Sequence, residues 1–191
     1  MTEFFHKGPT NGPVTTKAGP PNGPAISQEG PADGPAIETL LDIAFGPERH
    51  ARPSYALRNG LAATTELCFV SRLEGVLVGT IRFWPLAIPG AGSALLLGPI
   101  AVHPDHGGLG IGSGLILHSL GAAWTQGHDA VVAIGDGQYL SRFGFYPAHK
   151  FALEFPTPIE RGRFLVLELV PDVVDHNGGL VAKAAKAGAE F

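Results

Sequence analysis

Five glycines lie within eight residues in the middle of the chain, at positions 107, 108, 110, 112 and 114. They separate an apolar segment typical of a β-strand from one typical of an α-helix, although glycine weakens both kinds of element. A ligand that needs the bare backbone close to it would explain this density. The first turn of a helix offers unpaired N–H groups and the positive end of the helix dipole, so the natural ligand is a phosphate or pyrophosphate.

Three glycine-rich patterns can be compared with this stretch. The phosphate loop requires a lysine after its last glycine, and none is present. The dinucleotide pattern G-x-G-x-x-G fails because its sixth position is Ser113 or Leu115. The third pattern is Q/R-x-x-G-x-G/A after a strand that ends in valine. Residues 107–112 match it behind Val102, except that Gly107 replaces the usual glutamine or arginine.

The segment that contains this third pattern, LGPIAVHPDHGGLGIGSGLI, resembles the acyl-coenzyme-A-binding motif of the GNAT superfamily of N-acyltransferases. Upstream, PAIETLLDIAFGP resembles the first helix of that family, and YLSRFGF with a following proline resembles its Y-x-x-x-GF region. The resemblance covers roughly residues 25–170. It implies an N-acetyltransferase that uses acetyl-CoA as cosubstrate, needs no metal, and acetylates a primary amine.

The resemblance also implies which residues bind the coenzyme. A break at Gly98-Pro99, where proline removes a ladder donor, would leave the backbone of Ile100 and Val102 free to pair with the pantetheine arm. The loop amides would bind the pyrophosphate, and Arg142 could reach a phosphate. The predicted set is Ile100, Ala101, Val102, Gly107, Gly108, Leu109, Gly110, Ile111, Gly112, Ser113, Gly114 and Arg142.

The reaction of the family is attack of a neutral amine on a thioester. A base must therefore take a proton from an ammonium group whose pKa is about 10.4. Many relatives carry a glutamate on the fourth strand, where this chain has no carboxylate. The candidate bases are Asp136, His103 and Glu74, and we select Asp136, which follows the predicted fifth strand.

The general acid of the family is usually a tyrosine four residues before the glycine of GF. In this chain that position is Leu140, and the tyrosine lies one step earlier, at 139. One step on a helix is about 100° of rotation, so Tyr139 is either the acid, which is our choice, or a packing or coenzyme contact. Tyr55 and Arg58 lie where the substrate-side helices would be, and we predict that they bind the acceptor.

Hydrophobic periodicity predicts the elements that position these residues in an α/β (α+β) domain with a mixed sheet of about six to seven strands and about four helices. The predicted helices are 36–44, 54–58, 111–126 and 138–143; the predicted strands are 67–71, 76–84, 93–102, 130–134, 151–155 and 163–170, with a possible edge strand at 25–28. Repeated Gly-Pro pairs predict a disordered leader over 1–23, followed by the domain at 24–172 and a flexible tail at 173–191.

Composition narrows the possible partners. The net charge is −4 without a basic run, which argues against nucleic acid, and no apolar run approaches the roughly 20 residues of a membrane span. The single cysteine, Cys68, is typical of a reducing compartment, so we expect a cytoplasmic location. We expect a monomer or a homodimer. Two other functions stay open: a non-catalytic acyl-CoA sensor, and an acyltransferase that uses longer chains or an acyl carrier protein.

Overall fold

The computed structural model describes residues 23–175 and 178–184, so the predicted leader lies almost entirely outside the described residues. In the described part, a mixed sheet of eight strands forms the centre of the molecule. Its order is β1 (Ala25–Gln28), β2 (Phe69–Leu73), β3 (Val76–Ala87), β4 (Ala94–Val102), β5 (Ala130–Ile134), β8 (Phe164–Glu168) and β6 (Tyr146–Pro147), and β10 (Ala182–Lys183) pairs with β3. The mixed α/β fold is confirmed.

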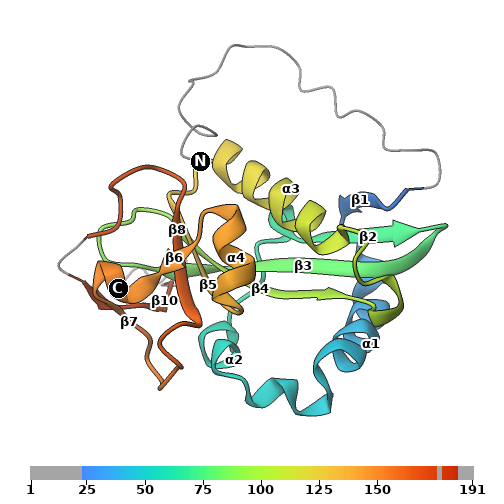
Figure 1. Cartoon of the computed structure of the whole chain (residues 1–191), viewed down its shortest axis with the longest axis horizontal. Helices are drawn as coiled ribbons and strands as arrows, with labels where there is room; N and C mark the ends of the chain where they lie inside the picture. The colour runs from blue at the N-terminus through green and yellow to red at the C-terminus, as the bar shows by residue number, and fades with distance from the viewer. Residues whose placement is uncertain (1–22, 176–177, 185–191) are drawn as a thin grey trace, which may run out of the picture.

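The described α-helices cover both faces of this sheet. They are α1 (Gly34–Phe45), α2 (Pro53–Arg58), α3 (Ile111–Thr125) and α4 (Gly137–Leu140). Helix α3 lies on one side of the sheet, and α1 and α2 lie on the other (Figure 1). None of these helices is both long and apolar enough to span a membrane.

Helix α3 packs unusually close to β3. A Cβ atom at Gly79 would lie 2.9 Å from Cγ2 of Ile111 and 3.1 Å from Cδ1 of Leu115, so a larger residue would push the helix away. Gly79 is also the register partner of Val102, the last residue of β4. The contact therefore places the start of α3 beside the end of β4.

Strands β4 and β5 run parallel and then separate. Their pairing extends from Ala94↔Ala130 to Leu97↔Ala133 and stops there, although β4 continues to Val102 beside β3. The separation begins at Gly98-Pro99, as the proline in the strand predicted. The end of β4 thus has one paired edge and one edge that faces a gap.

The C-terminal segment differs from the sequence-based expectation. Val174 and Val181 are buried, β9 (Gly179–Leu180) pairs with β7 (Leu153–Glu154), and β10 pairs with β3. The prediction of a domain end at 172 and a flexible tail is therefore wrong for residues 173–175 and 178–184. Isolated valines in a polar segment give no periodicity, so only their tertiary partners reveal that they belong to the core.

The predicted strand at 151–155 is shorter than expected. A 3-10 helix occupies Ala148–Phe151, and Ala152 has a φ of 52°. Only Leu153–Glu154 form a strand, in the small sheet with β9. Leu153, Phe151 and Phe155 belong to a hydrophobic cluster that also holds Leu57 of α2 and Val181, and they do not extend the central sheet.

Candidate active site

The N-terminus of α3 is a group of uncapped backbone donors that follows an exposed loop. Gly110 precedes the helix with a φ of 75°, no described side chain caps the first turn, and the first turn contains no acidic residue. The hydrogen bond from the Gly114 N–H to the Gly110 carbonyl, 2.9 Å long, leaves the N–H groups of residues 111–113 without partners inside the helix. Residues 107–110 are exposed. The site therefore fits a phosphate group that approaches from solvent.

Tyr139 lies over this first turn. Its hydroxyl oxygen is 3.3 Å from Oγ of Ser113, and a Cβ atom at Gly112 would lie 3.1 Å from the same hydroxyl. Glycine at 112 thus makes room for the tyrosine. The hydroxyl is held at the anion-binding end of α3, and the ring packs against Phe143 at a centroid distance of 5.4 Å.

The unpaired edge of β4 offers further backbone groups. The His103 N–H donates to the Val78 carbonyl of β3 at 2.8 Å. Because backbone direction alternates along an antiparallel strand, the N–H and C=O groups of Ile100 and Val102 point away from β3 and into the gap. An extended chain in the gap could bond to them as a strand would.

A cavity of about 530 Å³ occupies this gap. Both separating strands line it: residues 97–100 come from β4 and residues 134–136 from the end of β5. Tyr139 and Leu140 of α4 close one side, and α2 contributes Tyr55 and Arg58. We call this space the gap cavity.

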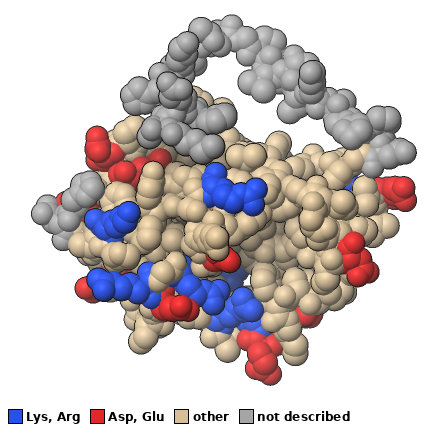
Figure 2. Space-filling model, viewed as in Figure 1, with Lys and Arg blue, Asp and Glu red and all other residues tan. Residues whose placement is uncertain are grey.

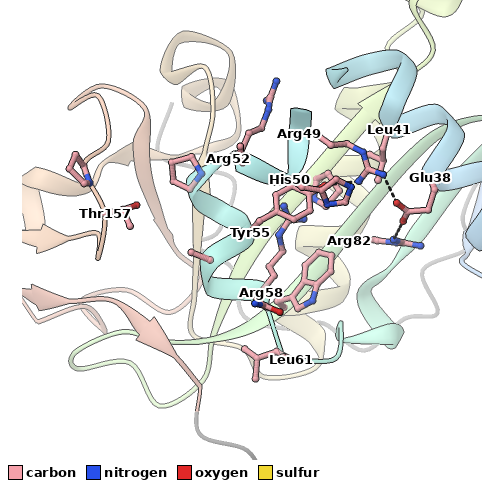
Figure 3. Close-up of a pocket in the computed structure, with 18 residues that line it drawn as sticks. Glu38, Leu41, Arg49, His50, Arg52, Tyr55, Arg58, Leu61, Arg82 and Thr157 are labelled. Carbon is pink, nitrogen blue, oxygen red and sulfur yellow. Dashed lines mark hydrogen bonds and ion pairs between the residues drawn. The ribbon is translucent and has the colours of Figure 1, made fainter. Parts of the chain in front are cut away.

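A second cavity, of about 820 Å³, lies between α1, α2 and the middle of the sheet (Figure 3). We call it the acceptor cavity. It adjoins the gap cavity, because both are lined by Arg49, Arg52, Pro53, Tyr55, Arg58, Pro99 and Pro158. Lys and Arg side chains also gather on the visible face beside α2 (Figure 2).

An ion-pair network forms one wall of the acceptor cavity. Arg49 bonds through Nη2 to Glu38 at 2.5 Å, and its Nη1 donates to the Tyr55 hydroxyl at 2.6 Å. Arg82 bonds to Glu38 as well, at 3.1 Å. Burial alone would raise the pKa of Glu38, but the two arginines outweigh it and hold that pKa below its usual value. Glu38 is therefore a poor proton acceptor, although it faces the cavity.

Comparison with known proteins agrees with this geometry. Residues 35–146 match the acetyltransferase (GNAT) family. The chain belongs to the GNAT acetyltransferase family. The match includes the glycine loop, the whole of α3 and both strands that border the gap.

Relatives of this family align along most of the chain. The uncharacterized N-acetyltransferase YhbS of Escherichia coli K12 is 31% identical over 152 residues, which are 76% of this chain and 87% of YhbS. A crystal structure of Escherichia coli YhbS in complex with CoA has a TM-score of 0.74 at 28% identity, covering 88% of this chain and 93% of that one. A GNAT acetyltransferase from Brucella melitensis in complex with acetyl-CoA has a TM-score of 0.64 at 29% identity, covering 86% and 97%.

The structure brings most of the predicted site residues together. The start of α3 lies beside the end of β4, and Tyr55 and Arg58 line both cavities. Arg142 is exposed and lines neither cavity; its guanidinium carbon is 5.5 Å from the centroid of the Tyr139 ring. Its predicted contact with a phosphate stays a prediction.

The candidate bases are separated by the fold. Asp136 lines the gap cavity, and its Oδ1 caps α4 by accepting the Tyr139 N–H at 3.0 Å. His103 and Glu74 line neither cavity; Glu74 lies in the turn between β2 and β3. Leu140, in the usual position of the tyrosine, is 4% exposed and belongs to the core as well as to the cavity wall.

Sequence reasoning missed several residues of the acceptor cavity. Arg49 was not singled out, because its partners on α1 and α2 come together only through the turn at Pro47–Ala51. Trp84 of β3 also lines the cavity, and nothing in its sequence context separates it from a core aromatic. Among the described residues, no three side chains of His, Cys, Asp or Glu group as metal ligands.

Proposed function

We propose that this GNAT protein acetylates an amine held in the acceptor cavity, with acetyl-CoA bound across the gap between β4 and β5. The observation that carries the proposal is that the two cavities share a wall at Pro99 and α2. A thioester in the gap and an amine in the acceptor cavity would meet at that wall. The CoA and acetyl-CoA complexes of the two similar structures support this choice of cosubstrate.

The backbone would do most of the binding. The amides at the start of α3 would hold the pyrophosphate, because they follow an exposed loop, have no side-chain cap and have no acidic residue in their turn. The backbone of Ile100 and Val102 would pair with the pantetheine arm. The N–H of Ile100 would also polarise the thioester carbonyl, since a donor fixed on a strand stabilises the negative charge that develops on that oxygen.

Acetyl transfer forms a bond from the amine nitrogen to the carbonyl carbon and breaks the carbon–sulfur bond. We assign Asp136 as the group that takes the amine proton, directly or through water, because its Oδ2 stays free while Oδ1 caps α4. A thiol has a pKa near 8.5, so the thiolate leaves readily and an acid is helpful rather than essential. Tyr139 is the candidate acid, and its bond to Ser113 favours the alternative role of a coenzyme contact.

We infer a cytoplasmic location from the single cysteine, which suits a reducing compartment, and from the use of acetyl-CoA. A monomer or a homodimer stays a prediction.

The proposal is tested by incubating the protein with acetyl-CoA and a set of primary amines. Thiol release that depends on the amine, with an equal amount of N-acetyl product by mass spectrometry, is the expected result. Propionyl- and octanoyl-CoA in parallel measure the preference for chain length. Binding of acetyl-CoA without any amine-dependent thiol release would contradict the proposal and would favour the acyl-CoA sensor.

A further inference from the structure

Arg58 is a buried cation at the border of the two cavities. It ends α2, is 7% exposed and lines both spaces. Its Nη1 donates to the Gly98 carbonyl at 3.1 Å, its Nε donates to the Ser54 carbonyl at 3.3 Å, and its Nη2 donates to Oγ of Ser54 at 3.2 Å. All of these acceptors are uncharged.

The neighbouring arginines of the acceptor cavity are different. Arg49 is paired with Glu38 and Asp42, and Arg82 is paired with Glu29 and Glu38. No carboxylate among the described residues bonds to Arg58. The fold thus supplies counter-charges to Arg49 and Arg82 but not to Arg58. Arg52, the fourth arginine that lines the acceptor cavity, is exposed, so water solvates its charge.

Arg58 must keep its charge, because a guanidinium does not lose its proton in a protein. Burial lowers the pKa of Arg58, which means that the site does not stabilise the cation as water does. The rings of Tyr55 and Trp84, with centroids 3.8 and 4.8 Å from its guanidinium carbon, compensate in part through cation–π attraction. Figure 3 shows the Arg58 side chain beneath the Tyr55 ring. The Tyr55 hydroxyl, which accepts a hydrogen bond from Arg49, also interacts favourably with the Arg58 guanidinium.

The hydrogen-bonding capacity of Arg58 is also unfilled. A guanidinium has five N–H groups. Three of them donate to Ser54 and Gly98, and Tyr55 is the other described side chain with which the guanidinium interacts favourably. A carboxylate that approaches the terminal nitrogens could accept the N–H groups that stay unfilled.

We propose that the acceptor carries a carboxylate as well as its amine, and that Arg58 binds this carboxylate. The inference rests on the proposed function and names the class of its acceptor. Pro99 alone separates the Gly98 carbonyl held by Arg58 from the Ile100 N–H that would face the thioester. A group on Arg58 and an amine at the thioester are therefore close enough to belong to one small molecule, such as an amino acid or an ω-amino acid.

The first test uses the wild-type protein with acetyl-CoA. The substrates are glycine, β-alanine, 4-aminobutyrate, 6-aminohexanoate, alanine and glutamate. Each is compared with its amide, in which a neutral amide group replaces the carboxylate that Arg58 would bind. At least one carboxylate should exceed its amide by tenfold or more in kcat/KM, because a hydrogen-bonded charge of this kind contributes that much. Equal rates for both members of every pair, or no acetylation of any carboxylate, would overturn the inference.

The second test uses Arg58→Gln and Arg58→Lys, with Arg161→Gln as a control on an exposed residue that lines neither cavity. Arg58→Gln should lower kcat/KM for the carboxylate at least tenfold more than for its amide, mainly through KM, and should keep the thermal stabilisation by acetyl-CoA. Arg58→Lys should restore part of the preference. Equal losses for carboxylate and amide would show that Arg58 only positions Gly98, and would overturn the inference.

These outcomes separate the two proposals. If amides and plain amines are acetylated at the same rates as the carboxylates, the proposed function stands and only the inference about the acceptor fails. If acetyl-CoA neither stabilises the protein nor releases thiol with any amine, the proposed function fails with it. If Arg58→Gln does not fold, the comparison of each carboxylate with its amide on the wild-type protein still tests the inference.

Discussion

A single negative charge at Gly110 should remove coenzyme binding without damaging the fold. Gly110 has a φ of 75°, and nothing lies within 4 Å of a Cβ atom built on it. Asn and Asp tolerate this left-handed conformation at a cost of about 1 kcal/mol. In Gly110→Asp the carboxylate also gains about 0.3–1 kcal/mol from the helix dipole, so the free variant should be about as stable as the wild type.

The effect on the ligand is much larger. A carboxylate about 4 Å from a pyrophosphate charge, at an effective dielectric constant of about 20, is repelled by about 4 kcal/mol, which is about a thousandfold in Kd. At an acetyl-CoA concentration of about 100 times the wild-type Kd, linkage stabilises the wild type by about 2.7 kcal/mol. For a chain of this size that is a rise in Tm of roughly 5–11 °C. The same concentration should move the Asp variant by less than about 1 °C.

The matched control is Gly110→Asn, which has the same shape and backbone demand without the charge. Thermal denaturation of the three proteins, with and without acetyl-CoA, measures the shift. The Asn variant should keep most of the shift and the Asp variant should lose it. A folded Asp variant that is stabilised as much as the Asn variant would refute the placement of the pyrophosphate at the start of α3.

Three further predictions follow from contacts elsewhere. Tyr139→Phe should raise KM for acetyl-CoA about fivefold, the loss of one hydrogen bond, and leave kcat within threefold; a tenfold fall in kcat at constant KM would instead make it the general acid. Val181→Ala should lower the free energy of unfolding by about 2 kcal/mol, measured in urea, whereas a flexible tail predicts no change. The pKa of Asp33 is lowered by the Gly30 N–H and by Arg72, so its ionised form stabilises the fold above about pH 4, and this contribution is lost as the pH falls through the folded-state pKa; Asp33→Asn should reduce stability at pH 7 and flatten its decline in acid.

The sequence by itself predicted the coenzyme half of the proposed site. Glycines in a short segment between a strand and a helix constrain the backbone locally, and a helix N-terminus binds anions whatever surrounds it. Pro99 predicted the break in β4 for the same kind of reason, because a missing N–H is a property of the residue itself. These signals depend only on neighbouring residues in the sequence, so they can be interpreted without knowledge of the fold.

The acceptor half was decided by tertiary structure. Tyr55 and Arg58 were placed there from their position along the chain, but nothing in the sequence shows that Arg49 is neutralised by carboxylates and Arg58 is not. That difference depends on which side chains α1, α2 and β4 bring within hydrogen-bonding distance.

Tertiary contacts also decided the register of Tyr139 and the end of the domain. The direction of the Tyr139 hydroxyl follows from the packing of α4 against the first turn of α3 at Gly112, which no spacing rule encodes. Val174 and Val181 look like residues of a polar tail, but both are buried in the cluster that holds Leu86 and Leu153. Val181 lies between β9, which pairs with β7, and β10, which pairs with β3. Burial is a property of what lies opposite a residue, so a segment without its own apolar pattern becomes part of the core only when a partner surface is present.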